Sequence, residues 1–199
     1  NNAGIAIFGP IGDTSFKDWQ RVLAVNLDGP FLMTQRAVPL VRDNGGGAPS
    51  MVGYLTSAFT PANAPIYNVF HSREGMESEA PTVFYPTPRL DVPLYVLISA
   101  RTGSAGEAFP YTLQGARRAT VVGEASAGAA NPRGMVPVSG GFAASISQGS
   151  PRNPNTGRNW EGVGVQPDVA APWNEALDRA QALALERIDA ADPARRDAA

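Results

Sequence analysis

Two short apolar runs with a helical stretch between them constrain the fold of this chain most. Residues 93–99, PLYVLIS, and residues 119–124, ATVVGE, are continuous apolar segments of the kind that form strands buried on both faces of a sheet. The intervening EAFPYTLQGARRA, residues 107–119, indicates a helix, which Pro110 must kink unless it lies near the first turn. A strand, a helix and a strand in this order predict a right-handed parallel βαβ unit.

The segments that follow place this unit in a mixed α/β fold rather than a purely doubly wound one. Residues 134–147, GMVPVSGGFAASIS, predict two strands around a turn at Gly140 and Gly141. Residues 151–159 form a polar turn cluster. An amphipathic helix is expected after Pro172, with one buried stripe made of Leu177, Ala180, Ala184 and Ile188.

The first part of the chain gives weaker signals. Residues 1–40 indicate a loop and then a helix, and residues 50–59, SMVGYLTSAF, predict a short helix. Residues 60–91 are rich in proline, alanine and polar residues, which predicts an irregular extended connection. At the other end, residues 191–199 are expected to be a frayed tail.

Composition excludes several classes of function. A formal net charge of -2 argues against binding nucleic acid or a membrane surface through bulk charge, and 43% hydrophobic residues support a packed core. No apolar run approaches the roughly 20 residues that span a bilayer. The chain has no cysteine, so disulfides, thiolate metal sites and a cysteine nucleophile are all excluded. His71 is its only imidazole and Lys17 its only lysine, and we expect no metal or cofactor site. Composition leaves the cellular compartment undecided.

Ser104 lies where the first buried strand leads into the helix, and two interpretations of it remain open. A helix start offers unpaired N–H groups and the positive end of the helix dipole, which suit a nucleophile whose reaction develops an oxyanion. The same four residues, Ser104 to Glu107, also spell a capping box, in which the serine hydroxyl would serve only to hold the end of the helix.

Residues 1–40 resemble the middle of a short-chain dehydrogenase/reductase. The resemblance rests on NNAG at the start and on the W…VNLxGxFLxTQ pattern that begins at Trp19. That family's catalytic Tyr-x-x-x-Lys does not occur, because Asp13 stands four residues before the only lysine, Lys17. Its glycine fingerprint for the cofactor pyrophosphate is also missing. We therefore expect a structural appendage and not a functional NAD(P)-dependent dehydrogenase.

Residues 41–190 resemble the C-terminal half of the tail-specific, or C-terminal-processing, serine peptidases, in the branch of tricorn protease and interphotoreceptor retinoid-binding protein. Four blocks carry the resemblance: VRDNGGGAPSMV, PLYVLISARTGSAGEAF, RRATVVGEASAGAANP and NWEGVGVQPDV. It implies a crotonase/ClpP-like core of stacked ββα units, and the chain as a whole then has the form of a fusion of two gene fragments. It also implies Ser104 as nucleophile, the amides of Ala105 and Gly46 as oxyanion donors, and Glu161 as the carboxylate that supports the general base.

The general base is the part of the resemblance that this sequence does not supply. One branch of the family uses a lysine about 25 residues after the serine, and that neighbourhood here, GEASAGAANP, has none. The other branch uses a histidine from the N-terminal half, which leaves His71, in a connecting stretch, as the remaining imidazole. Asn131 also replaces a histidine common in bacterial relatives.

These observations predict a serine hydrolase of the peptidase or esterase type, acting weakly on a peptide or small ester. The alternative is a non-catalytic protein that holds a small apolar ligand or a peptide in the same cleft, and nucleotide binding through residues 1–40 ranks last. Exposed sheet edges and apolar surface also predict a homo-oligomer.

Overall fold

The computed structural model describes residues 49–191, and the chain divides into two units, residues 1–44 and 45–199. The predicted helical segment at 1–40, Gly46 and Lys17 lie outside the described residues. So does the tail from residue 192 onward.

A three-stranded parallel sheet, in the order β3-β4-β8, forms the centre of the described unit. Its strands are β3 (Tyr95–Ile98), β4 (Thr120–Gly123) and β8 (Val169–Ala170). Helix α4 (Ala105–Gly115) connects β3 to β4, which confirms the predicted parallel βαβ unit. Pro110 stands in the second turn of α4 and is buried, so the carbonyl of Gly106 loses its usual helical donor there.

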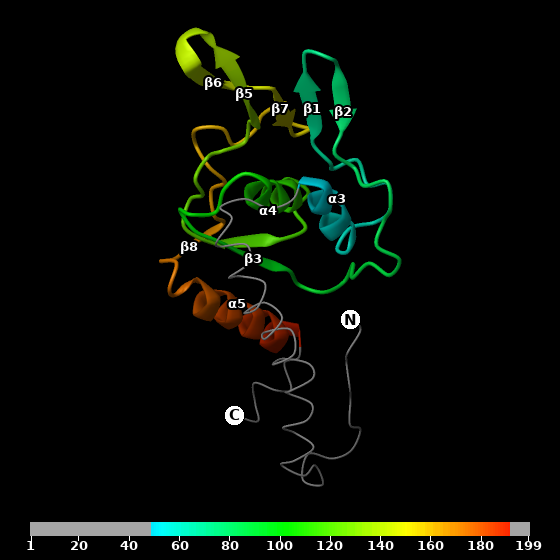
Figure 1. The fold of residues 1–199 in the computed structure, drawn as a ribbon. Helices are drawn as coiled ribbons and strands as arrows, with labels where there is room; N and C mark the ends of the chain where they lie inside the picture. The colour runs from blue at the N-terminus through cyan, green and yellow to red at the C-terminus, as the bar shows by residue number, and fades with distance from the viewer. Residues whose placement is uncertain (1–48, 192–199) are drawn as a thin grey trace, which may run out of the picture. The chain divides into compact units, whose positions relative to one another are not determined.

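Helices cover both faces of this sheet (Figure 1). Helix α3 (Pro49–Ser57) packs against α4 on one side, and α5 (Ala176–Ala191) packs against β3 and β4 on the other. Because neighbouring strand residues point to opposite faces, Val121 joins a core cluster with Ala108 and Trp160, whereas Val122 joins one with Ala176 and Ala180. The short helix predicted at 50–59 is confirmed as α3.

The prediction that both central strands are buried on both faces is right for β4 and wrong for β3. Val121 and Val122 of β4 have no exposed surface, but Leu97 of β3 is 39% exposed. The reason is the strand order: β3 stands at the edge of the sheet and pairs only with β4 among the described residues. An apolar run does not reveal whether its strand is central or at an edge.

The predicted buried stripe of α5 needs a similar correction. The helix begins at Ala176, and Ala176, Ala180 and Leu183 face the sheet, while Leu177 is 38% exposed. Ala184 is half-buried, and the side chain of Ile188 lies outside the described set. Ala176 and Ala180 pack against Val122, with Tyr95 and Val169 beside them.

The prediction of an irregular connection over residues 60–91 is wrong in part. These residues contain β1 (Val69–Ser72) and β2 (Met76–Ser78), and β1 pairs with both β2 and β7 (Gly149–Arg152) in an antiparallel sheet. His71 therefore belongs to a strand and not to a loop. Because β1 and β7 lie far apart in the chain, their pairing cannot be predicted from the local sequence of either strand.

The hairpin expected at residues 134–147 is confirmed as β5 (Arg133–Val138) and β6 (Phe142–Ser147). Gly140 and Gly141 both have positive φ, 80° and 78°, as a tight hairpin turn requires. The pairing register puts five apolar residues on one face, which we call the hairpin face: Val136, Val138, Phe142, Ala144 and Ile146. Phe142 is 73% exposed, so this face lacks a cover within the described unit.

A matched pair of substitutions tests this account of the core. Leu113→Ala removes a fully buried side chain of α4 and should lower the free energy of unfolding by about 2–5 kcal/mol. Leu97→Ala, at the exposed edge strand, should lower it by less than about 1 kcal/mol. Urea unfolding followed by circular dichroism measures both, and equal losses would contradict the assignment of β3 to the edge.

Candidate functional site

Ser104 sits in a strained backbone conformation at a strand-to-helix turn. Strand β3 ends at Ile98, a turn closed by the bond from Thr102 N–H to the Ser99 carbonyl (2.9 Å) follows, and α4 begins at Ala105. Ser104 has φ 53° and ψ -128° and is exposed. Such an angle for a residue with a side chain costs about 1–3 kcal/mol and persists only when its surroundings hold it. A strained serine between a strand and a helix is also the arrangement of a nucleophile elbow.

The capping question is answered by the hydrogen bonds at this turn. Ser104 and Glu107 have the arrangement of a capping box, and the Ser104 N–H donates to Glu107 Oε2 at 2.7 Å. The Ser104 side chain has the capping-box placement toward the Glu107 N–H, but this N–H makes its hydrogen bond to the Ser104 carbonyl oxygen, at 2.8 Å, and the hydroxyl makes no cap hydrogen bond of its own. A hydrogen bond to a charged group contributes about 1.5–3 kcal/mol, which is comparable to the backbone strain. The helix start is therefore held by the carboxylate and by backbone atoms.

Glu107 itself is fully buried, and four donors surround its carboxylate. Besides the Ser104 N–H, Oε2 accepts from Ala129 N–H at 2.9 Å, and Oε1 accepts from Gly128 N–H at 2.7 Å and from Ser126 Oγ at 2.6 Å. Ser126 Oγ accepts in turn from Val165 N–H at 2.7 Å. A buried carboxylate is costly unless it is hydrogen-bonded in this way. Sequence reasoning noticed Glu107 only as a capping partner.

Residues 126–131, which we call the strap, have every backbone N–H bonded. Ser126 N–H donates to the Val165 carbonyl (3.1 Å) and Ala127 N–H to the Thr102 carbonyl (2.9 Å). Glu107 takes the next two amides, and Glu161 Oε2 takes those of Ala130 and Asn131, each at 2.8 Å. Two carboxylates thus hold four successive amides of the strap.

Glu161, predicted to support the general base, is the second of these two carboxylates, and we call each carboxylate with its two strap amides a clamp. Its other oxygen, Oε1, lies 3.5 Å from Arg133 Nη2. Within residues 49–191 no hydrogen bond joins Glu161 to Ser104 or to His71. Its predicted role at the base stays a prediction.

His71 and Asn131 are placed in separate surroundings. His71 is half-buried in β1, paired with Met76 on one side and Ser150 on the other, and its ring makes no hydrogen bond with any described residue. The Asn131 side chain accepts from Asn159 Nδ2 at 3.0 Å, and the same Nδ2 reaches Ser150 Oγ at 2.7 Å. The structure brings His71 into no direct contact with Ser104, so its assignment as base also stays a prediction.

One backbone donor is available beside Ser104. Among the described residues, the N–H of Ala105 has no acceptor. Because a trans peptide points its N–H opposite to its carbonyl, and the Ser104 carbonyl accepts from inside α4, this N–H points out of the helix start. Such a donor can stabilise negative charge on an oxygen close to the Ser104 hydroxyl. The second predicted donor, Gly46, is not described.

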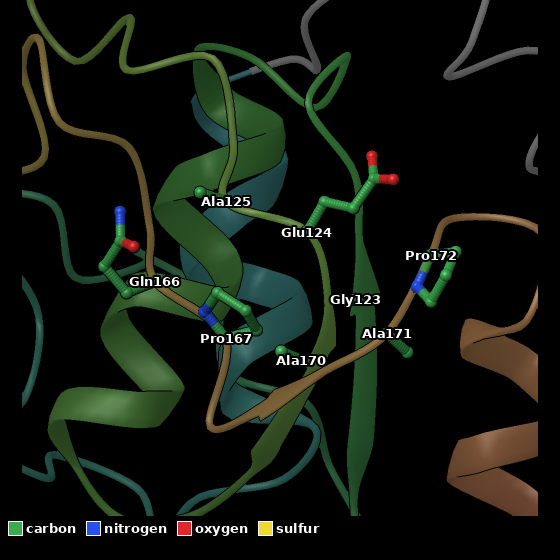
Figure 2. Close-up of a pocket in the computed structure, with 8 residues that line it drawn as sticks. All are labelled: Gly123, Glu124, Ala125, Gln166, Pro167, Ala170, Ala171 and Pro172. Atoms are coloured by element: carbon green, nitrogen blue, oxygen red, sulfur yellow. The ribbon is translucent and has the colours of Figure 1, made fainter.

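A shallow pocket of about 520 Å³ lies at the carboxyl end of β4 (Figure 2). Gly123, Glu124 and Ala125 line it from one segment, and residues 166–167 and 170–172 line it from another. The carboxylate of Glu124 connects two neighbouring segments: it accepts from Ala100 N–H at 3.4 Å and from Trp173 N–H at 3.1 Å. Ser104 is not among the lining residues, and the pocket is linked to the turn before Ser104 through the bond between Glu124 and Ala100.

The described residues show neither a metal centre nor a spanning helix. No group of three or more histidine, cysteine or acidic side chains converges among them. None of their helices is both long and apolar enough to cross a bilayer. Burial raises the pKa of the Glu79 carboxyl, and a hydrogen bond from Asn68 opposes the rise.

Two family models match the chain. The model of peptidase family S41 matches residues 41–171, and the model of short chain dehydrogenases matches residues 1–64. Both resemblances inferred from the sequence are thereby confirmed. The two matches overlap over residues 41–64, so the dehydrogenase-like stretch extends beyond the 40 residues expected.

Curated relatives of the first stretch are an oxidoreductase and dehydrogenases. An uncharacterised oxidoreductase of Thermotoga maritima is 47% identical over 47 residues, which is 24% of this chain and 19% of that protein. D-threitol dehydrogenase of Mycolicibacterium smegmatis is 44% identical over 62 residues, 31% of this chain and 23% of the enzyme. The chain therefore spans about a fifth of the length of these proteins.

Solved structures similar to this chain share its fold at low identity. A photosystem II D1 C-terminal processing protease aligns with a TM-score of 0.52 and 20% identity, over 68% of this chain and 36% of that one. A lipoprotein from Streptococcus agalactiae aligns with a TM-score of 0.53 and 19% identity, over 71% of this chain and 51% of that one. The chain thus spans between a third and a half of their length.

The two carboxylate oxygens of Glu161 have different partners, and the stability effects of removing them can be compared. Glu161→Ala leaves the amides of Ala130 and Asn131 without their acceptor and should lower the free energy of unfolding by about 1–3 kcal/mol. Arg133→Ala removes only the exposed ion pair and should lower it by less than about 1 kcal/mol. Chemical denaturation of both variants is the measurement, and an Arg133 effect equal to that of Glu161 would refute the clamp.

Proposed function

Because the chain belongs to peptidase family S41, we propose that it is a serine hydrolase of the peptidase type in which Ser104 is the nucleophile. The observation that carries the proposal is the exposed Ser104 in its strained conformation, with its hydroxyl not engaged in the cap. A strained residue held by its surroundings is frequent at active sites. We also propose that the α/β unit is the crotonase/ClpP-like core of the predicted type, bounded at residues 41–190.

In the proposed reaction the Ser104 oxygen forms a bond to the acyl carbon of the substrate, and the hydroxyl proton passes to a base. The oxyanion that develops accepts from Ala105 N–H and, by the family pattern, from Gly46 N–H. The bond between the acyl carbon and the leaving amine or alcohol then breaks as the base returns the proton to that leaving group. Water next attacks the acyl carbon of the Ser104 ester, its proton passes through the base to the Ser104 oxygen, and the acid is released. His71 is the imidazole assigned to accept the proton, with Glu161 as its supporting carboxylate.

Weak activity on activated esters follows from this assignment. A serine hydroxyl without an activated partner is a poor nucleophile, and Glu161 already accepts two strap amides. An incomplete triad still retains about 10³–10⁴-fold catalysis over water through the oxyanion donors and binding. Small esters, whose leaving groups need less help from an acid, should therefore react more readily than peptides. Dehydrogenase activity is not part of the proposal, because residues 1–64 lack the family's Tyr-x-x-x-Lys.

The second candidate is a binding protein without catalysis. The pocket at the carboxyl end of β4 favours it, because glycine, alanine and proline make up most of its lining and its volume falls within the range of about 300–1,000 Å³ of ligand sites. A small apolar ligand would be the expected occupant. Stabilisation of the fold by a fatty acid or retinoid, without any turnover that depends on Ser104, would favour this candidate.

A fluorophosphonate probe tests the hydrolase directly. The probe should label the full chain and should not label Ser104→Ala, because the phosphorus bonds to the nucleophilic oxygen. Ser145→Ala, which removes another exposed serine, is the matched control and should label like the wild type. Equal labelling of wild type and Ser104→Ala would exclude Ser104 as the nucleophile.

We further propose that two copies of the chain pair through the hairpin face. A hairpin of two strands is marginally stable alone, and a larger sheet or a covered apolar face stabilises it. Arg133, the first residue of β5, is the only charged residue from 133 to 147, so the rest of both strands carries none of the charges that oppose pairing between copies. A second hairpin of the same sequence supplies matching edges and a matching apolar face.

Light scattering after size-exclusion chromatography tests the pairing. The wild type should have twice the monomer mass at micromolar concentration, and Phe142→Asp should have the monomer mass. Val83→Asp is the control, since Val83 is 68% exposed and lies outside the hairpin. A wild type that is strictly monomeric would contradict the proposal.

A further inference from the structure

The carboxylate of Glu107 connects Ser104 to the strap, because residues of both donate hydrogen bonds to it. One oxygen, Oε2, accepts from Ser104 N–H at 2.7 Å and from Ala129 N–H at 2.9 Å, so the strap residue Ala129 lies directly beside Ser104. The other oxygen accepts from Ser126 Oγ and Gly128 N–H, and Ser126 continues the connection to Val165. Two loops far apart in sequence are thereby held against the start of α4.

Both polar groups of the Ser104 backbone are held by the same residue. The Glu107 side chain accepts from the Ser104 N–H, while the Glu107 N–H donates to the Ser104 carbonyl at 2.8 Å. The two bonds act on the two sides of the Ser104 Cα, so together they hold its φ and ψ. Because the Ser104 carbonyl and the Ala105 N–H share one peptide plane, the direction of the Ala105 N–H is held as well.

The backbone of the strap is closely packed against residues 162–165, so it has little room to shift if the bonds to Glu107 are lost. Gly164 has φ 73°, and a Cβ there would lie 2.3 Å from the Ser126 carbonyl oxygen. Gly128 has φ 78°, and a Cβ there would lie 3.0 Å from the Gly164 nitrogen. The strap and residues 162–165 are thus in backbone contact, and the carboxylate of Glu107 connects this packed pair to Ser104.

We propose that Glu107 is a positioning residue: its carboxylate holds Ser104 in the strained conformation and aims both the hydroxyl and the Ala105 N–H, without touching substrate. The proposal rests on the proposed function, because it concerns the reactivity of Ser104. A purely structural role would make a different prediction, namely that loss of Glu107 affects reactivity only as far as it unfolds the chain.

Labelling kinetics separate the two roles. Glu107→Gln keeps the size of the side chain but puts an amide NH₂ against N–H donors, so it should slow fluorophosphonate labelling of the folded full chain by about tenfold to a hundredfold, the range expected for a misplaced reacting group. Leu113→Ala is the matched control, since Leu113 is also fully buried in α4 and touches none of these bonds. At a temperature where both variants are folded by circular dichroism, the control should label at the wild-type rate within about twofold.

Amide hydrogen exchange gives a second readout that does not depend on labelling. In Glu107→Gln the exchange rates of the Ser104 and Ala129 amide protons should rise at least about tenfold more than that of Val121, in the core of β4, whose exchange follows global unfolding. The positioning role would be overturned if Glu107→Gln were labelled at the wild-type rate, or if Glu107→Gln and Leu113→Ala were labelled more slowly by the same factor. If the wild type takes no label, the proposed function fails. Exchange then decides the geometric part: unchanged protection of Ser104 and Ala129 would overturn it, and selective loss would support it.

Discussion

A buried carboxylate surrounded by four donors is the constraint on which the described site depends. Glu107 has no exposed surface, and its donors come from Ser104 and from residues 126–129. Removing a partner from a buried charge is strongly destabilising, at about 3–5 kcal/mol. The relative position of the start of α4 and the strap therefore contributes strongly to the stability of the unit, and the strained Ser104 is part of that arrangement.

The two clamping glutamates divide the strap between them. Glu107 accepts from residues 128 and 129, and Glu161 accepts from residues 130 and 131. The strap is thereby a fixed wall beside Ser104, and its exposed side chains near the serine, Ala127 and Ala129, are small.

Local patterns predicted the elements well and their surroundings less well. The βαβ unit, the hairpin, α3 and β4 follow from apolar runs and turn residues that lie next to one another in the chain. The edge position of β3, the buried face of α5 and the pairing of β1 with β7 depend on partners elsewhere in the sequence, so they were missed. Glu107 shows the same limit at the site: its capping partner is three residues away, but its other three donors lie about twenty residues further on. A serine and glycine among alanines at 125–130 was the only local sign of them.

The geometry of Ser104 is the central claim, and a crystal structure of the full chain at atomic resolution tests it most directly. The account predicts a positive φ at Ser104, its N–H on a Glu107 oxygen, and its hydroxyl pointing to solvent with no bond to the Glu107 N–H. An extended Ser104 whose hydroxyl accepts from the Glu107 N–H would contradict it, because the serine would then be a helix cap.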